Sequence, residues 1–233
     1  MDPIQEAKGK AALEAIKHVK DGFIVGLGSG STAAFAIEAM GERVKREKLR
    51  VMGVPTSYQA FLLAVECGIP VTTLDEHPQI DVTIDGADQI TPELFLNKGM
   101  GAALAREKIV AASSKLNVII VDEKKKVKLL GENDQSVPIE VLPFAISLAK
   151  RKIIDAGGKP ILREVKGKLG PVITDNGNAI LDSYFGLIVK PAEFEVKLKM
   201  IPGVVETGFF VGLTDIAYVG TVSAVEKIEK IMF

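Results

Sequence analysis

Apolar residues recur along the first half of the chain in two alternating patterns. Apolar positions at three- and four-residue spacing, typical of amphipathic helices, occupy residues 4–19, 32–45, 58–67 and 101–113. Short apolar runs between them predict strands at residues 23–27, 51–54, 71–74, 81–85, 93–97 and 116–121. Short apolar strands separated by helices are typical of parallel sheets buried on both faces. The pattern therefore predicts an α/β fold with a Rossmann-like parallel sheet.

The pattern changes from about residue 131 onward. Strands are predicted at residues 137–141, 160–165, 179–187 and 202–206, and helices at 144–156 and 191–200. A strand at 216–219 and a helix at 223–231 then return to the first domain. We expect a Rossmann-like domain of residues 1–130 plus 211–233, into which a smaller α+β domain of residues 131–210 is inserted.

Composition and charge narrow the possible ligands. The chain has 233 residues, of which 47% are hydrophobic and 25% charged, which excludes a disordered or fibrous protein. It has 29 Lys and Arg against 30 Asp and Glu, with no long block of like charges. The basic surface of a duplex-DNA binder is therefore not expected. Any anionic ligand is expected to be small.

The single cysteine and the first residues of the sequence bear on the cellular compartment expected for the protein. Cys67 has no partner for an intrachain disulfide and no CxxC motif, and we expect it to be a small core residue. The first residues lack the basic-then-apolar order of a signal peptide, and no apolar run approaches the ~18 residues of a membrane span. We expect a cytoplasmic protein with no membrane partner.

A glycine- and hydroxyl-rich segment, Gly26-Leu-Gly-Ser-Gly-Ser-Thr32, lies between a predicted strand and a predicted helix. Glycines let a ligand approach the backbone, and the N–H groups at the start of a helix can hold a phosphate. The dinucleotide pattern G-x-G-x-x-G fails at Ser31, and the lysine of a P-loop is missing, which disfavours a nicotinamide cofactor. A tight turn with a Ser or Thr cap is the structural alternative.

Two acids and a lysine occupy later loops. Asp85 and Asp88 follow a buried strand, at the edge where open α/β sheets bind ligands. Such a pair can hold sugar hydroxyls, bind a metal or transfer protons, although Asp-Gly is equally common in plain turns. Lys98, in the loop 97–101, can place a positive charge beside backbone donors. Taken alone, an exposed loop lysine is the simpler interpretation.

The predicted helix at 101–113 is apolar except for three consecutive charged residues, Arg106, Glu107 and Lys108. The helical neighbours of Glu107 are all apolar, and an acid in such surroundings has a raised pKa that suits a general base. The spacing does not choose among the three charged residues, because the other two also have apolar neighbours. A solvated charged stripe is the alternative.

The order of these motifs resembles ribose-5-phosphate isomerases of the A type, and the resemblance extends over almost the whole chain. Residues 24–33 are similar to the family's phosphate loop, and residues 85–89 to its Asp-Gly-Ala-Asp-Glu motif. Residues 98–108 are similar to its lysine loop and catalytic helix. Two further matches, at 172–178 and 201–205, belong to its smaller domain. Two departures are Met100, where the family usually has Gly, and Gln89, where it usually has Glu.

The resemblance implies an aldose-ketose isomerase of the non-oxidative pentose phosphate pathway, which interconverts D-ribose 5-phosphate and D-ribulose 5-phosphate through an enediolate without metal or organic cofactor. It implies that Glu107 is the general base and that Lys98 stabilises the oxyanion. Asp85 and Asp88 would position hydroxyls and assist ring opening. The substrate-binding residues are expected to be Ser29, Gly30, Ser31, Thr32, Gly86, Ala87, Gly99, Met100, Gly101 and Lys125.

Three expectations stay open at this point. The flanking Lys124 and Lys126 leave a solvated basic run as an alternative for Lys125. A sugar-phosphate-binding, effector-sensing module without turnover is the alternative function, and it would need neither Glu107 nor Lys98. The family also suggests a homodimer or homotetramer.

Overall fold

The computed structural model describes residues 2–230 and divides them into two compact units. Unit 1 comprises the described residues up to Ala87, Arg106–Lys126 and those from Gly212 onward. Unit 2 comprises Asp88–Ala105 and Val127–Val211. The chain thus leaves unit 1 between Ala87 and Asp88 and returns to it between Ala105 and Arg106. The domain boundaries expected near residues 131 and 211 stay a prediction.

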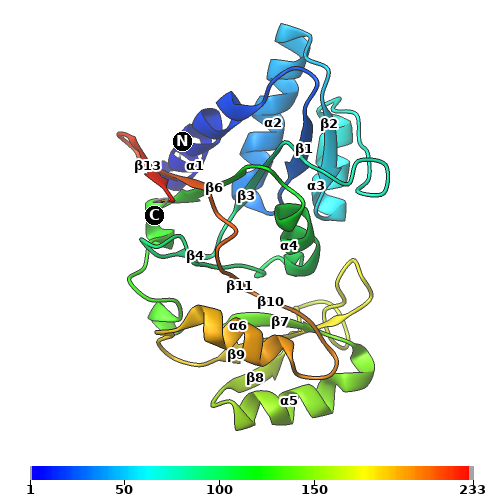
Figure 1. The fold of residues 1–233 in the computed structure, drawn as a ribbon, viewed down its shortest axis with the longest axis vertical. Helices are drawn as coiled ribbons and strands as arrows, with labels where there is room; N and C mark the ends of the chain where they lie inside the picture. Colours follow the sequence, from blue (N-terminus) through cyan, green and yellow to red (C-terminus); the bar gives the residue numbers. More distant parts are fainter. Residues whose placement is uncertain (1, 231–233) are drawn as a thin grey trace. The chain divides into compact units, whose positions relative to one another are not determined.

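Unit 1 is built on a six-stranded sheet of order β13-β12-β6-β3-β1-β2 (Figure 1). Its strands are β1 (Ile24–Leu27), β2 (Met52–Pro55), β3 (Val82–Gly86), β6 (Asn117–Asp122), β12 (Ile216–Gly220) and β13 (Val225–Glu229). Every neighbouring pair from β12 to β2 is parallel, and only β12 and β13 are antiparallel. The predicted parallel α/β sheet is confirmed.

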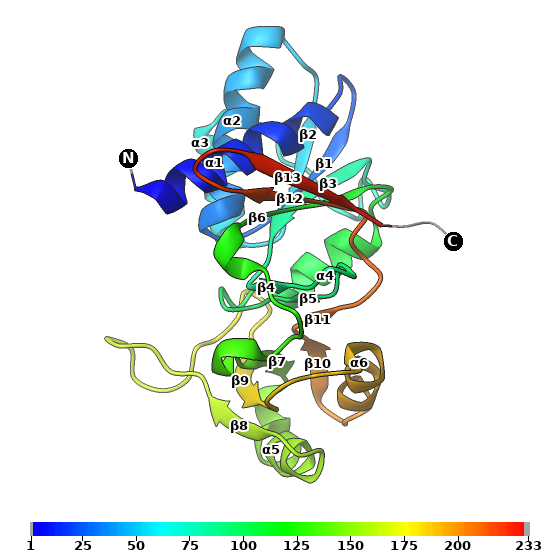
Figure 2. The ribbon, with the colours of Figure 1, turned by 90° about the vertical axis from the view of Figure 1, so that its left-hand side faces the viewer.

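Helices cover both faces of this sheet. They are α1 (Pro3–Ala15), extended by the 3₁₀ turn η1 (Ile16–His18), α2 (Ser31–Glu47), α3 (Tyr58–Glu66) and α4 (Leu104–Ala112). Val25 and Leu27 of β1 pack into the core formed with α1 and α2, which lie side by side (Figure 2). The alternate residue Ile24 packs against the cluster that contains Val110 of α4. Since successive strand residues point to opposite faces, burial on both sides explains the continuous apolar runs.

The predicted helix at 223–231 is wrong. Residues Val225–Glu229 form β13, which pairs antiparallel with β12 after a turn closed by the Thr221 N–H donating to the Ala224 carbonyl (2.8 Å). The three-residue spacing of Val225 and Ile228 fits a helix, but pairing with the edge of β12 decides the structure. Ile231 lies outside the described residues. The strand expected at 71–74 is only an isolated bridge between Val71 and Gly53.

Unit 2 holds a four-stranded antiparallel sheet of order β10-β7-β9-β8 and a small sheet of order β11-β5-β4. The strands are β7 (Val137–Val141), β8 (Lys159–Leu162), β9 (Ala179–Tyr184), β10 (Val204–Thr207), β4 (Gln89–Ile90), β5 (Leu96–Asn97) and β11 (Phe209–Phe210). The helices are α5 (Ile146–Asp155) and α6 (Pro191–Lys199), with 3₁₀ turns η3 (Glu132–Asp134) and η4 (Pro143–Ala145). Inward residues of β7 pack against Ile153 of α5 and Leu198 of α6, which gives this unit its own core.

The turn at 174–178 is organised around a buried carboxylate. Glu140 of β7 is fully buried, and its Oε1 accepts hydrogen bonds from the Thr174 hydroxyl (2.9 Å) and the amides of Asn176 (3.1 Å) and Asn178 (2.8 Å). Three donors on one oxygen offset the desolvation of the buried carboxylate. The Asp-Asn-Gly-Asn sequence therefore forms a turn fixed by β7.

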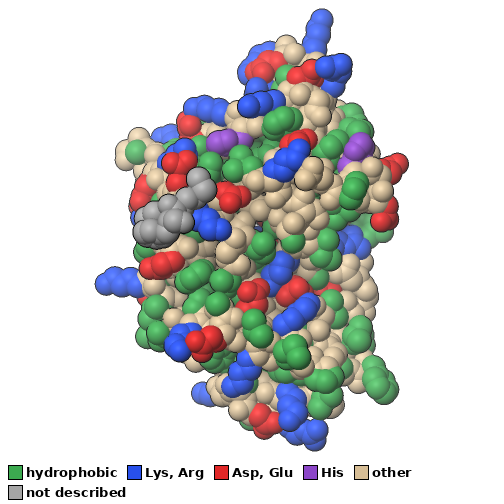
Figure 3. Space-filling view, viewed as in Figure 1, with side chains coloured by type: hydrophobic (Ala, Val, Ile, Leu, Met, Phe, Trp, Pro, Cys, Tyr) green, Lys and Arg blue, Asp and Glu red, His purple; other side chains and the backbone are tan. Residues whose placement is uncertain are grey.

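Charged side chains are distributed without a dominant sign on the face seen in Figure 3. Lys and Arg lie interspersed with Asp and Glu over the described residues of that face. Within residues 2–230, no helix is both long and apolar enough to cross a bilayer.

Candidate active site

The β1–α2 loop brings a helix start to the carboxyl edge of the sheet. Gly30 precedes α2 with φ 93° and contributes no side-chain cap. The Ser29 N–H donates to Asp85 Oδ1 (3.1 Å) and the Gly30 N–H to Gln59 Oε1 (2.7 Å), so both amides serve to hold the loop. The backbone donors that an anion could bind are therefore those of the first turn of α2, which begins with Ser31 and Thr32. Here the helix dipole favours an anion.

Lys8 adds a positive charge to this helix start. Its Nζ donates to the Ser31 hydroxyl oxygen (3.0 Å). The sequence did not indicate this residue, because Lys8 lies in α1, outside any motif, and reaches Ser31 only through the packing of α1 against α2. A lysine beside uncapped helix N–H groups is suited to bind a phosphate.

Asp85 is the next-to-last residue of β3 and is fixed by the same loop. It is 3% exposed, and its Oδ1 also accepts from the Gly86 N–H (2.7 Å). A Cβ at Gly28 would collide with the Asp85 carboxylate and Cα, so only glycine allows this close approach. The Ser29 hydroxyl lies within hydrogen-bond distance of Thr56 Oγ1 (2.7 Å) and Ser57 Oγ (2.6 Å). Unit 1 thus joins Asp85 and the predicted phosphate loop into one polar cluster.

Unit 2 brings Asp88 to the lysine loop, residues 98–101. Asp88 Oδ2 accepts a hydrogen bond from the Met100 N–H (3.0 Å), and the Asp88 N–H donates to the Asn97 carbonyl (2.9 Å). The interpretation of Asp85-Gly-Ala-Asp88 as a plain Asp-Gly turn therefore falls short, because both acids hold backbone of other loops.

Lys98 is 3% exposed, so the alternative of an exposed loop lysine is wrong. Its N–H donates to the Gly208 carbonyl (2.8 Å), and its Nζ lies 5.3 Å from the centroid of the Phe210 ring. The aromatic face favours the charged ammonium group at this distance. A buried lysine held in this way can present positive charge in a low-dielectric environment, where charge acts most strongly.

The two departures from the family pattern are explained within unit 2. The left-handed backbone conformation falls on Gly99 (φ 107°) and not on Met100, so position 100 needs no glycine, and the Met100 side chain is 46% exposed. The Gln89 amide donates to the Glu132 carbonyl (2.8 Å) and accepts from the Gly131 N–H (2.8 Å). A carboxylate can only accept, so glutamine suits this position.

The remaining predicted residues lie in unit 1. Glu107 is 5% exposed and Lys108 9%, so a fully solvated charged stripe on α4 is wrong. Lys125 ends the 3₁₀ turn η2 (Glu123–Lys125) and is half-buried, whereas Lys126 forms an ion pair with Glu226 (2.7 Å). Gly86 and Ala87 end the first segment of unit 1, directly before Asp88. Within residues 2–230, no three His, Cys, Asp or Glu residues are grouped to hold a metal ion.

Unit 1 combines a parallel sheet with the helix start beside Lys8 and the buried acids Asp85 and Glu107, and unit 2 carries the buried Lys98. Such features are typical of a class of protein: α/β enzymes that act on a small anionic substrate. Comparison with known proteins specifies the family. The sequence profile described as Ribose 5-phosphate isomerase A (phosphoriboisomerase A) matches residues 52–224. A ribose-5-phosphate isomerase A from Methanothermobacter thermautotrophicus is 48% identical over 221 residues, covering 95% of this chain and 96% of that protein.

Solved structures agree with this assignment. The ribose 5-phosphate isomerase A of Methanocaldococcus jannaschii has 44% identity and a TM-score of 0.93, covering 97% of this chain and 99% of its own. A D-ribose-5-phosphate isomerase in complex with phospho-erythronic acid has 45% identity and a TM-score of 0.94 with the same coverage. The chain belongs to the ribose 5-phosphate isomerase A family.

Proposed function

We propose that this chain interconverts D-ribose 5-phosphate and D-ribulose 5-phosphate by proton transfer through an enediolate. As a member of the family it is an aldose-ketose isomerase. One observation carries the assignment of the chemistry: the base and the cation that the family motifs indicate, Glu107 and Lys98, are only 5% and 3% exposed. Ionisable side chains are rarely so buried unless they are paired or functional.

The reaction needs a base, a stabilised oxyanion and a proton transfer between two oxygens. The Glu107 carboxylate removes the C2 proton of the open-chain aldose, and the electron pair moves through the new C1–C2 double bond to O1. The Lys98 ammonium group stabilises the negative charge of the enediolate. A proton passes from O2 to O1, and Glu107 returns its proton to C1. Substrate and product have the same formula, so the scheme needs no redox cofactor.

Asp85 and Asp88 hold fixed orientations for the sugar hydroxyls. One oxygen of Asp85 accepts the backbone N–H groups of Ser29 and Gly86, and one oxygen of Asp88 accepts the N–H of Met100. Backbone donors fix each carboxylate without using a flexible side chain. Fixed carboxylates suit the positioning of hydroxyls during ring opening and proton transfer.

The phosphate group is assigned to the start of α2. Ser31, Thr32 and Lys8 supply N–H groups, hydroxyls and a positive charge there. One of the relatives binds phospho-erythronic acid, a phosphorylated sugar acid. This supports a sugar phosphate as the substrate. Lys125 stays a predicted contact based on the family resemblance.

Lys8→Met is expected to raise KM for ribose 5-phosphate about 10-fold, since a hydrogen bond to a charged group contributes about 1.5–3 kcal/mol. The turnover number should change little, because the phosphate stays remote from the proton transfer. Steady-state kinetics measures KM and the turnover number separately. Lys17→Met, which removes an exposed lysine paired with Glu14, is the control that should leave KM unchanged. An unchanged KM in Lys8→Met would remove the lysine from phosphate binding.

A direct assay of ribose 5-phosphate conversion by the purified chain tests the function, and we expect full activity after exhaustive dialysis against a chelator. The acid pair at 85 and 88 has no accompanying His or Cys in its motif, and the proposed steps are proton transfers. Loss of activity that a divalent cation restores would contradict the metal-free scheme. Absence of conversion with retained ribose 5-phosphate binding would favour the sensing module instead.

Cytoplasmic location, the absence of a nucleic-acid partner and a homodimeric or homotetrameric state stay predictions. The assembly can be measured directly by sedimentation of the purified chain.

A further inference from the structure

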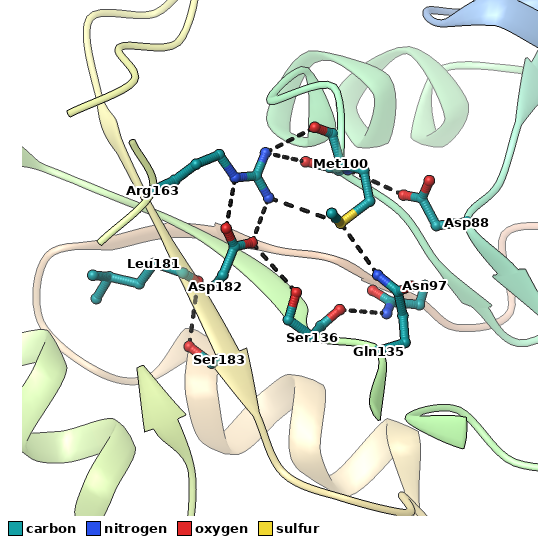
Figure 4. Close-up of polar contacts among 10 residues, drawn as sticks. Asp88, Asn97, Met100, Gln135, Ser136, Arg163, Leu181, Asp182 and Ser183 are labelled. Carbon is teal, nitrogen blue, oxygen red and sulfur yellow. Dashed lines mark hydrogen bonds and ion pairs between the residues drawn. The ribbon is translucent and has the colours of Figure 1, made fainter. Parts of the chain in front are cut away.

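A largely buried ion pair in unit 2 contacts the backbone of the lysine loop (Figure 4). Arg163 follows β8, and Asp182 lies on the neighbouring strand β9. The Arg163 Nε donates to Asp182 Oδ2 (2.8 Å) and its Nη2 donates to Asp182 Oδ1, which makes the pair bidentate. The two side chains are only 10% and 16% exposed. Charge-assisted bidentate pairs are among the stronger hydrogen-bonded contacts between side chains.

The remaining guanidinium nitrogen is directed at the loop. Arg163 Nη1 donates to the carbonyl of Gly99 (2.9 Å) and to that of Met100 (2.9 Å). The Met100 side chain lies over the same group, with its Sδ 4.0 Å from Nη2 and 3.2 Å from Gln135 Nε2. Asp182 thus orients a guanidinium that binds two successive carbonyls directly after Lys98.

Further hydrogen bonds, to Asp88 and within the segment itself, also hold the lysine loop. Asp88 accepts the Met100 N–H (3.0 Å), and the Ala102 N–H donates to the Gly99 carbonyl (3.0 Å). Both Gly99 (φ 107°) and Ala102 (φ 60°) have left-handed backbone conformations, which are unfavourable for alanine. A strained segment persists only where surrounding contacts fix it.

Arg163 itself is rigidly mounted. Its own N–H donates to the Ile180 carbonyl (2.9 Å), and its carbonyl accepts from the Val172 N–H (2.8 Å). The backbone of Arg163 and its guanidinium group are therefore held by contacts that do not involve the lysine loop. The hydrogen bonds from Arg163 therefore fix the lysine loop relative to strands β8 and β9.

We propose that Arg163, oriented by Asp182, is a positioning residue that fixes the lysine loop and thereby the place of Lys98. This inference rests on the role proposed above for Lys98. Lysine cannot replace the arginine, because a single ammonium group cannot bind the carboxylate on one side and two carbonyls on the other with fixed fork geometry. A displacement of about 1 Å in a reacting group can lower a rate about 10²-fold.

The test compares Arg163→Met with a matched control, Arg43→Met. Arg43 in unit 1 makes the same kinds of contact, since its Nε binds Glu47 (2.9 Å) and its Nη1 donates to the carbonyls of Ile16 (2.6 Å) and Val19 (2.9 Å). Both variants should lower the melting temperature. Only Arg163→Met should lower kcat, by at least ~10-fold, with KM nearly unchanged.

Hydrogen exchange provides a readout that does not depend on activity. In Arg163→Met the amides of Met100 and Ala102 should exchange faster than in the unmodified chain, while Arg43→Met should leave them unchanged. If Arg163→Met does not fold, Arg163→Lys replaces it, because this variant keeps the charge opposite Asp182 but loses the carbonyl contacts. The same loss of kcat and the same faster exchange are then expected.

Equal kcat values in the Arg163 and Arg43 variants, or unchanged exchange at Met100 and Ala102, would overturn the positioning role. If Lys98→Met still loses activity in that case, the proposed function stands and only the role of Arg163 fails. Wild-type activity in Lys98→Met would contradict the role of Lys98 instead, whatever the exchange data show.

Discussion

Glu107→Gln is expected to lower kcat by at least ~10²-fold, the low end of the contribution of a general base. Glutamine keeps the volume and polarity of the side chain at this buried position but cannot accept the C2 proton. Ribose 5-phosphate binding should change little, because the phosphate is assigned to α2 and Lys8. Steady-state kinetics gives kcat, and binding of the substrate to the variant is measured separately by calorimetry.

The exposed Glu38 of α2 offers the control, since Glu38→Gln makes the same chemical change on the surface of unit 1. It should leave turnover unchanged. Exchange of the C2 proton with solvent gives a second readout, which Glu107→Gln should abolish together with turnover. Turnover near that of the unmodified chain would show that another group, with Asp85 as the next candidate, removes the proton.

Lys98→Met is expected to lower kcat about 10²- to 10³-fold, the range seen when one donor to a developing oxyanion is removed. Methionine has a similar length and can keep packing beside Phe210, so the loss isolates the positive charge. KM should change far less than kcat, because the charge on the substrate oxygen develops only during proton transfer. Steady-state kinetics with a melting curve separates this effect from unfolding.

Lys197→Met is the matched control within unit 2. Lys197 also lies over an aromatic ring, with its Nζ 5.8 Å from the centroid of Phe194, but on the exposed helix α6. It should retain full kcat. A Lys98→Met variant with kcat within a few-fold of the control would exclude the lysine as the oxyanion-stabilising group.

The parallel sheet could be predicted from the sequence because its signal is local. The runs at 81–85 and 116–121 became β3 and β6 within one residue at each end, and the run at 137–141 matches β7. β13 could not be predicted, because two apolar residues three apart fit a helix until the edge of β12 is available for pairing.

The candidate site shows the same contrast. Asp85 and Asp88 could be placed at a strand end by spacing alone, whereas the burial of Lys98 depends on Gly208 and Phe210, more than a hundred residues later. Lys8 and Arg163 were missed because each reaches its partners through packing of a different element. Contacts between residues distant in the chain carry no periodic signal in the sequence.

The antiparallel strand β13 also affects how the protein behaves in concentrated solution. All residues of β12 are buried, and β13 covers its outer edge with three charged residues, Glu226, Lys227 and Glu229. An uncovered apolar edge is a template for pairing with other chains, and charged edge strands prevent such pairing. Removal of β13 would therefore expose an aggregation-prone edge, so that the last strand protects the colloidal stability of the enzyme.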